Sequence, residues 1–211
     1  VPPASPALRP HHAFVFRATV EEFRRSRAYA LEMTENSVLF SEAFAFVSFC
    51  RLYDVDYVLE SGVYKGVSTE LWSLFVKDVV GVDVFISPEA EARLGGAANV
   101  RLISGDGRQL LPAALEAEPT RRAAVFIDGP KGELAIRLAL DLIRRFPQVA
   151  FVAMHDMTPY RRELSRLGAV FFSDETWFQE AYGGLDAPFR ARPDLAAGGT
   201  MAFLPGVAAA P

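Results

Sequence analysis

The sequence is poor in the features that mark several protein classes. It contains one cysteine, Cys50, which excludes an intrachain disulfide and fits a small buried hydrophobe in a reducing compartment. No run of about eighteen uncharged apolar residues is present, and no secretory signal is evident, so we expect no membrane span. The formal net charge of −4 provides no excess of basic residues for binding phosphates. We therefore expect a cytoplasmic protein without nucleic acid or a membrane as its partner.

What the sequence does contain is a regular alternation of apolar runs and amphipathic runs after Val55. Such an alternation predicts a parallel sheet with helices on both faces, wound through right-handed crossovers. The expected strands are Val55–Glu60, Val79–Val84, Val100–Ser104, Ala123–Asp128, Val149–His155, Ala169–Ser173 and Thr200–Leu204. The expected helices are Ser68–Val76, Pro88–Leu94, Arg108–Leu115, Glu133–Arg145 and Arg161–Leu167.

The residues before the first strand are predicted to form a separate helical region. A proline-rich arm, Val1–Pro10, precedes a helix at Glu21–Met33 and a second helix that begins at an N-cap on Ser41. The expected organisation is an N-terminal arm and helical extension at residues 1–54, followed by an α/β domain at residues 55–211. Three phenylalanines of the second helix could serve the core or the subunit interface of a homo-oligomer: Phe44, Phe46 and Phe49.

A long segment, residues 174–199, separates the last two expected strands and is rich in aromatic residues and glycine. Two interpretations are open. The segment is either a loop that covers a substrate or a packed excursion at the surface.

The central motif of the chain lies between Val58 and Leu71, where an apolar strand, a glycine turn and the start of a helix follow one another. This arrangement presents backbone N–H groups to nucleotide-like ligands in α/β proteins, although an ordinary packed turn is the alternative. Gly62 allows a ligand to approach the main chain. Glu60 is expected to point its carboxylate above the turn. Ser68 and its neighbour are expected to satisfy free N–H groups of the helix.

Polar residues follow each of the five leading strands, where α/β sheets bind their ligands. Asp83 comes about twenty positions after Gly62, the spacing at which an acid reaches the ribose hydroxyls of a nucleotide. The residues delivered to this edge are Glu60, Gly62, Asp83, Asp106, Asp128, Gly129, Lys131, His155 and Asp156.

The spacing Glu60-x-Gly62-x-x-x-Gly66, together with the acids that follow, resembles the class I S-adenosylmethionine-dependent methyltransferases. The resemblance covers roughly residues 55–204 and implies a seven-stranded, mostly parallel Rossmann-like sheet. It also implies that Asp83 binds the ribose, that Asp106 lies beside the adenine and that Asp128 lies at the methyl-transfer face. The turn residues that would surround the methionine part of the cofactor are Glu60, Gly62, Val63, Tyr64, Gly66 and Ser68.

Within this class, Ile127-Asp128-Gly129 and Met154-His155-Asp156 look like the corresponding segments of small-molecule O-methyltransferases, some of which use a metal. This resemblance implies that Asp128 and Asp156 hold a divalent cation such as Mg²⁺. The cation would lower the pKa of a substrate hydroxyl and align it with the methyl group. His155 would be the general base, and Lys131 would orient the acceptor or assist in removing its proton.

The sequence thus predicts a methyltransferase that transfers a methyl group from S-adenosylmethionine to a hydroxyl oxygen of a small-molecule acceptor. Another nucleotide-using enzyme, such as a dehydrogenase, is a weaker alternative because Tyr64 and Val67 stand where its fingerprint requires glycine. A third alternative is a methyltransferase-like domain that binds without catalysing, since a fold does not fix a function.

Overall fold

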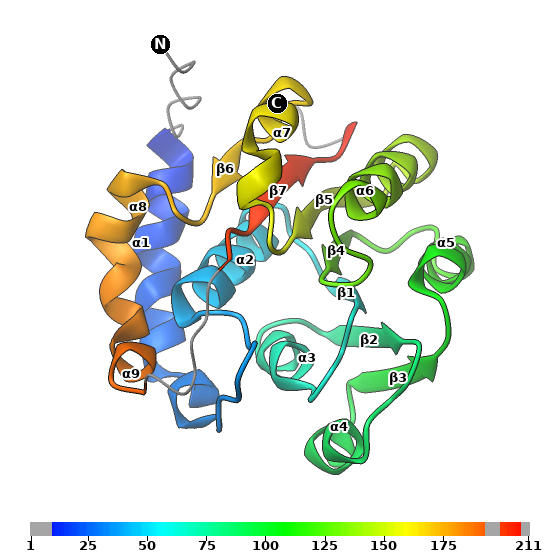
Figure 1. Cartoon of the computed structure of the whole chain (residues 1–211), viewed down its shortest axis with the longest axis horizontal. Helices are drawn as coiled ribbons and strands as arrows, with labels where there is room; N and C mark the ends of the chain where they lie inside the picture. The colour runs from blue at the N-terminus through cyan, green and yellow to red at the C-terminus, as the bar shows by residue number, and fades with distance from the viewer. Residues whose placement is uncertain (1–9, 193–198, 208–211) are drawn as a thin grey trace.

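The computed structural model describes residues 10–192 and 199–207, which contain a seven-stranded sheet with the order β3-β2-β1-β4-β5-β7-β6 (Figure 1). Strands β1 to β5 pair in parallel, and β7 is antiparallel to both of its neighbours. The prediction of a mostly parallel, doubly wound sheet is therefore confirmed. The strands are β1 (Tyr57–Ser61), β2 (Asp78–Asp83), β3 (Val100–Ser104), β4 (Ala123–Ile127), β5 (Val149–Met154), β6 (Phe171–Phe172) and β7 (Ala202–Pro205).

Helices cover both faces of the sheet, and this explains why the central strands are apolar without alternation. Strand β4 is buried along its whole length. The helices are α1 (Pro10–Arg25), α2 (Phe40–Leu52), α3 (Val67–Ser73), α4 (Pro88–Leu94), α5 (Gly107–Ala117), α6 (Glu133–Arg145), α7 (Arg161–Arg166), α8 (Thr176–Tyr182) and α9 (Ala187–Arg190), with the 3₁₀ turns η1 (Arg27–Ala30), η2 (Thr158–Tyr160) and η3 (Gly183–Asp186). Phe126 packs with α2 and α3 on one face, whereas Val125 and Ile127 pack with α5 and α6 on the other.

Helix α2 lies directly against the sheet, between α1 and the central strands (Figure 1). The ring of Phe46 lies 5.9 Å from that of Phe126 and 5.3 Å from that of Phe151. Phe44, Phe46 and Phe49 are all buried within the chain, so they serve its core. The boundary at residue 54 stays a prediction.

The predicted helix at Glu21–Met33 is wrong in its limits. Helix α1 begins at Pro10 and ends at Arg25, because Ser26 ends it and starts η1. The Ser26 hydroxyl donates to the carbonyl of Phe23 at 2.6 Å and accepts from the N–H of Ala28 at 3.1 Å. The rest of the predicted arm, residues 1–9, lies outside the described residues.

The predicted N-cap at Ser41 is also wrong, since the N-cap of α2 is Leu39 and Ser41 lies within the first turn of the helix. The carboxylate of Glu42 accepts the N–H of Leu39 at 2.9 Å and thereby satisfies the start of the helix. Ser41 instead binds Asp186 through its hydroxyl at 2.6 Å and its N–H at 2.8 Å. This contact joins α2 to the segment between β6 and β7.

That segment is mostly helical as far as residue 192, with α8, η3 and α9 packed beside α1 and α2 (Figure 1). Phe178, Leu185 and Phe189 are buried there. For residues 174–192 the interpretation as a packed excursion is therefore correct, and residues 193–198 lie outside the described residues. Among the described helices, none combines the length and apolar character that crossing a membrane requires.

Candidate active site

The glycine turn after β1 lies where the connections of the sheet change direction, with β2 on one side of β1 and β4 on the other. Ligands of open α/β sheets bind at this point. Gly62 has a φ of 98°, and a Cβ built on it would lie 2.7 Å from the nitrogen of Gly129. The carbonyl of Ser61 accepts the N–H groups of Asp128 at 2.8 Å and Gly129 at 2.9 Å. Glycine at residue 62 therefore lets the ends of β1 and β4 meet.

Asp83, at the end of β2, holds the turn in shape. Its Oδ2 accepts the N–H of Val63 at 2.8 Å and that of Tyr64 at 3.0 Å. Tyr64 has a φ of 49°, a conformation that these two hydrogen bonds stabilise. The other oxygen, Oδ1, accepts the N–H of Phe85 at 3.3 Å. The structure therefore places Asp83 beside the turn, as expected, with part of its carboxylate engaged by the main chain.

Glu60 does not point above the turn, and this expectation is corrected. The side chain is 0 % exposed. Its Oε2 accepts the hydroxyl of Thr69 at 2.5 Å, and its Oε1 accepts that of Ser68. Burial raises the pKa of Glu60 to about 8, although both hydroxyls favour the carboxylate. The two hydroxyls bind Glu60 and do not cap α3, so the buried Glu60 is tied to the start of α3 and supports the turn from within the protein.

Two other predicted cofactor residues have local structural contacts. Gly66 precedes α3 with a φ of 78°, and a Cβ on it would lie 2.9 Å from the Cδ1 of Leu94 in α4. Asp106 caps α5 by accepting the N–H of Arg108 at 2.9 Å. The guanidinium of Arg108 binds both carboxylate oxygens, which lowers the pKa of Asp106.

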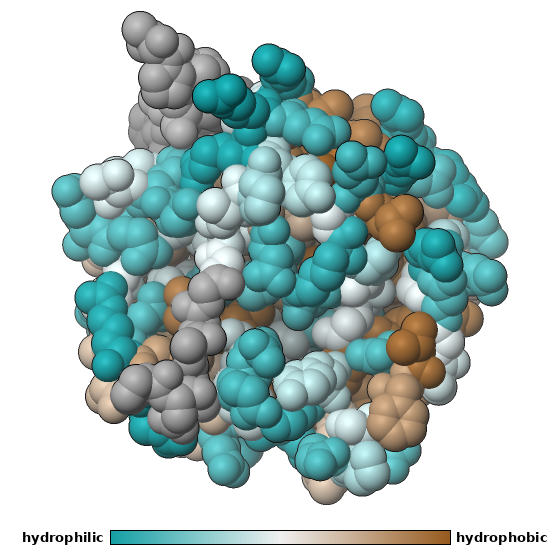
Figure 2. All heavy atoms as spheres, viewed as in Figure 1, coloured by the Kyte–Doolittle hydropathy of each residue, from teal (hydrophilic) through white to brown (hydrophobic). Residues whose placement is uncertain are grey.

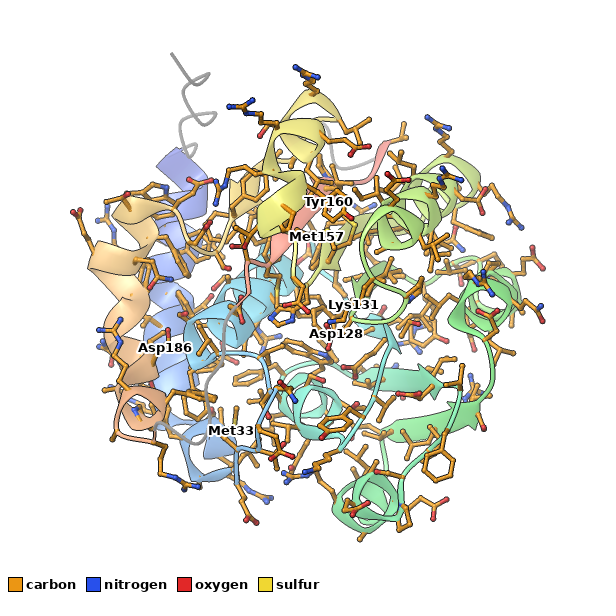
Figure 3. All side chains as sticks on the ribbon, viewed as in Figure 1. Met33, Asp128, Lys131, Met157, Tyr160 and Asp186 are labelled. Atoms are coloured by element: carbon orange, nitrogen blue, oxygen red, sulfur yellow. The ribbon has the colours of Figure 1, made fainter. Side chains whose placement is uncertain are left out.

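The structure brings the predicted acceptor-side residues together at the ends of β4 and β5. Asp128 and Lys131 face each other above the sheet (Figure 3). The Lys131 ammonium contacts Asp128 and lies 2.6 Å from the Oδ2 of Asp156. The Nδ1 of His155 lies 3.2 Å from the Oδ1 of Asp128 and 3.5 Å from the Oδ1 of Asp156.

A fifth member of this cluster, Glu42, was missed by the sequence analysis. Its Oε2 lies 3.2 Å from the Nε2 of His155, and its Oε1 accepts the hydroxyl of Ser173 at 3.0 Å. The side chain of Glu42 is 2 % exposed. Its carboxylate, the only one in the mostly apolar helix α2, is the signal that could have marked this residue. Its partner could not be identified from spacing, because 113 positions separate Glu42 from His155.

The environment of His155 does not favour the role of general base, which stays a prediction. Burial alone would lower the pKa of this histidine, but Glu42 on one ring nitrogen and Asp128 on the other raise it to about 10. Both nitrogens therefore carry protons at neutral pH. As an imidazolium, His155 donates hydrogen bonds and has no lone pair with which to take a proton.

Lys131 is held in its charged form for the same reason. Burial opposes the charge of Lys131, but Asp128 and Asp156 outweigh it and raise the pKa of the ammonium. Burial also opposes the charge of Asp128, but His155 and Lys131 hold its pKa below the ordinary value. Lys131 therefore stays charged near neutral pH, and a charged ammonium donates hydrogen bonds and does not accept a proton.

The predicted Mg²⁺ site does not fit these residues. One oxygen or nitrogen from each of Asp128, His155 and Asp156 lies within 4.8 Å of the others, which is close enough for a shared ion. However, the Lys131 ammonium already lies between the two carboxylates, and both ring nitrogens of His155 already face carboxylates, Glu42 on one side and Asp128 on the other. Met157, which follows Asp156 in the sequence, carries a thioether, and a thioether is not a ligand for a hard cation.

A short segment, residues 34–38, covers the glycine turn. The space between this segment and the turn has a volume of about 20 Å³, which is room for about one water molecule. Glu35 of this segment accepts the hydroxyl of Tyr64 at 3.2 Å and also binds the ammonium of Lys65. A cofactor that lies on the turn would therefore have to displace residues 34–38.

No protein-family model matches the chain, and no curated protein matches its sequence. Among solved structures, similar folds include an rRNA methylase from Streptococcus thermophilus, with a TM-score of 0.52, 15 % identity, and coverage of 76 % of this chain and 93 % of that one. The O-methyltransferase TomG from Streptomyces achromogenes, solved with S-adenosylmethionine, has a TM-score of 0.52, 16 % identity, and coverage of 91 % and 89 %. A dimethyladenosine transferase from Plasmodium falciparum has a TM-score of 0.52, 13 % identity, and coverage of 82 % and 63 %. At these identities the likeness establishes the fold.

Proposed function

We propose that this chain, which has the fold of the class I S-adenosylmethionine-dependent methyltransferases, transfers a methyl group from that cofactor to an oxygen of a small molecule. One observation carries the proposal: the glycine turn at the switch point of the sheet lies directly beside a cluster of charged residues. Gly62 comes within van der Waals distance of Gly129, the residue that follows Asp128. A cofactor on the turn would thus present its reactive end to this cluster.

The cofactor is proposed to lie across the ends of β1, β2 and β3. Gly62, Val63 and Tyr64 would form the floor beneath its methionine part. Asp83 keeps one carboxylate oxygen only weakly engaged, at 3.3 Å from the N–H of Phe85, and this oxygen would bind the ribose hydroxyls. Asp106 would lie beside the adenine with Arg108 bound to it. Three residues would act through the shape of the turn: Glu60, Gly66 and Ser68.

On the acceptor side, the chemistry requires alignment and a proton acceptor more than activation of the methyl group. Asp128 and Asp156 are carboxylates that can accept a hydrogen bond from an acceptor hydroxyl. Asp156 is the more exposed of the two, with 42 % of its side chain accessible. His155 and Lys131 would fix these carboxylates and compensate their charge. The proton of the acceptor would pass to a carboxylate or to water.

A small molecule is favoured over RNA as the acceptor, although the structural neighbours include enzymes named for each. The chain carries a formal net charge of −4. At the edge where the acceptor would arrive, Lys131 and His155 are already paired with Asp128 and Asp156. This edge therefore offers no excess of positive charge for a polyanion, whereas a small neutral molecule does not need one.

Calorimetric titration with S-adenosylmethionine and S-adenosylhomocysteine tests the cofactor. Micromolar binding of both is expected for the folded protein. A radiolabelled methyl group would then be followed into a panel of hydroxylated small molecules and into total RNA. Transfer to RNA alone would overturn the acceptor class, and absence of binding to a folded protein would overturn the proposed function.

A second candidate is a methyltransferase-like domain that binds a ligand without catalysis, and the closed turn favours it. The space of about 20 Å³ beneath residues 34–38 has to open before a cofactor can enter. Replacing Glu35 with Gln removes the charged contact with Lys65 and should accelerate cofactor association. If neither the wild type nor the variant binds the cofactor, the second candidate is preferred.

A further inference from the structure

Lys131 occupies a place that two carboxylates and one histidine would otherwise offer to a metal ion. Its ammonium contacts Asp128 and lies 2.6 Å from Asp156, and each of these carboxylates also faces the Nδ1 of His155. Lys131 lies in the loop after β4, next to Asp128 and near Met157, which follows β5 (Figure 3). The two carboxylates therefore already have their counter-ions within the chain.

A divalent cation would have to displace this arrangement. Mg²⁺ requires near-octahedral coordination by oxygen, so the ammonium would have to leave the carboxylate oxygens that it contacts. His155 could not follow as a ligand without giving up its hydrogen bonds to Asp128 and Glu42, at 3.2 Å each. Displacement would thus break several charged contacts at once.

We propose that Lys131 is the fixed cation of this site and that the oxygen of the methyl acceptor binds its remaining ammonium proton. This inference rests on the proposed function and names the acceptor-binding group within it. An ammonium has three donors, of which Asp128 and Asp156 take two. The Lys131 side chain is 51 % exposed, which leaves the third donor accessible from the open side of the cluster.

The proposal has a consequence for the acceptor. A metal ion with two open positions chelates a pair of neighbouring oxygens, whereas one ammonium proton binds a single oxygen. An acceptor with one hydroxyl is therefore sufficient, and a vicinal diol gains nothing over it. The hydroxyl would lie between Lys131, which binds its oxygen, and Asp156, which accepts its proton.

Lys77 is a matched control for substitutions of Lys131, because it is exposed and lies at the opposite end of the sheet, just before β2. Titration of the wild type with MgCl₂ and MnCl₂ should show no binding in the millimolar range. Lys131→Ala should bind Mn²⁺ with a Kd at least roughly tenfold below the highest concentration at which the wild type shows no binding, since two carboxylates lose a counter-ion. Lys131→Arg, which keeps a cation, and Lys77→Ala, which changes the same net charge elsewhere, should both behave like the wild type.

Three results separate this inference from the proposed function. Cofactor binding that is unchanged by chelator, with no binding of divalent cations, supports both. Wild-type binding of Mn²⁺ that is lost in Asp156→Asn overturns the role of Lys131, even when the cofactor binds. Absence of cofactor binding overturns the proposed function and, with it, the binding of a methyl acceptor to Lys131. Cation titration still reports on Lys131 as the fixed cation, because it does not require the cofactor. Should Lys131→Ala fail to fold, Lys131→Arg and the wild type still decide the question.

Discussion

The close approach of β1 and β4 at Gly62 makes a quantitative prediction. Gly62 has a φ of 98°, and a Cβ there would lie 2.7 Å from the nitrogen of Gly129 and 2.9 Å from the carbonyl carbon of Asp128. Both atoms belong to the main chain of a strand end, so they cannot move aside as a flexible side chain can. Gly62→Ala should therefore incur both a conformational and a steric penalty.

Two other glycines separate these penalties. Gly168 has a φ of 94° with no atom within 4 Å of a built Cβ, so Gly168→Ala incurs the conformational penalty alone. Gly96 also has open space and a φ that other residues adopt, so Gly96→Ala incurs neither. The smaller backbone freedom of alanine in the unfolded chain benefits all three variants alike and cancels in their differences.

The expected magnitudes follow from these contacts. Gly168→Ala should be less stable than Gly96→Ala by about 1–2 kcal/mol, the cost of a left-handed conformation with a Cβ. Gly62→Ala should be less stable than Gly168→Ala by a further ~1–3 kcal/mol, the cost of forcing atoms into a packed region. Gly96→Ala itself should lie within about 0.5 kcal/mol of the wild type.

Urea unfolding, followed through the fluorescence of Trp72 and Trp177, measures these differences, provided that the m-value stays constant. If Gly62→Ala unfolds at the same urea concentration as Gly168→Ala, the steric argument fails. The turn would then have room for a side chain, and the proposal that Gly62 is needed to join the ends of β1 and β4 would be refuted.

Three further predictions concern buried charges and the turn. Glu42→Ala should lower the free energy of unfolding by about 3–5 kcal/mol, because it removes the buried carboxylate that pairs with the Nε2 of His155. Glu22→Ala, which removes the exposed partner of Arg51, should change it by about 1 kcal/mol or less; equal effects in urea unfolding would contradict the buried pair. Asp83→Ala should weaken S-adenosylmethionine binding by about 1–3 kcal/mol in calorimetry, with Asp83→Asn intermediate, and unchanged affinity in a folded variant would remove Asp83 from the site. Because burial raises the pKa of Glu60 to about 8 from 4.5, the folded protein retains a proton that the unfolded chain loses; stability should fall as pH rises between these values, by at most about 1.4 kcal/mol per pH unit. Glu60→Gln should remove this component of the pH dependence, and an unaltered profile would show that Glu60 is ionised in the folded state.

Most of the fold could be predicted from local pattern. The limits of α4, α6 and β3 agree with the sequence prediction at both ends, and the other central strands agree within two residues. Buried parallel strands and amphipathic helices carry this information in the hydrophobicity of consecutive residues. The N-terminal helices were predicted less well, because Ser26 and Glu42 set their limits through side-chain contacts that a hydrophobic pattern does not reveal.

For the candidate site, too, the positions of the residues could be predicted from the sequence, whereas their contacts could not. The sequence by itself determined which residues reach the carboxyl edge of the sheet, because a polar residue after an apolar strand has to lie there. It therefore identified Gly62, Asp83, Asp128 and Asp156. Only the tertiary structure decided how their charges are compensated. The long-range contact with Glu42, together with Asp128, favours the charged form of His155 despite its burial, and the fold of one loop places the Lys131 ammonium between two carboxylates. Neither arrangement can be read from the sequence, because electrostatic free energy depends on distance and solvent exposure in three dimensions.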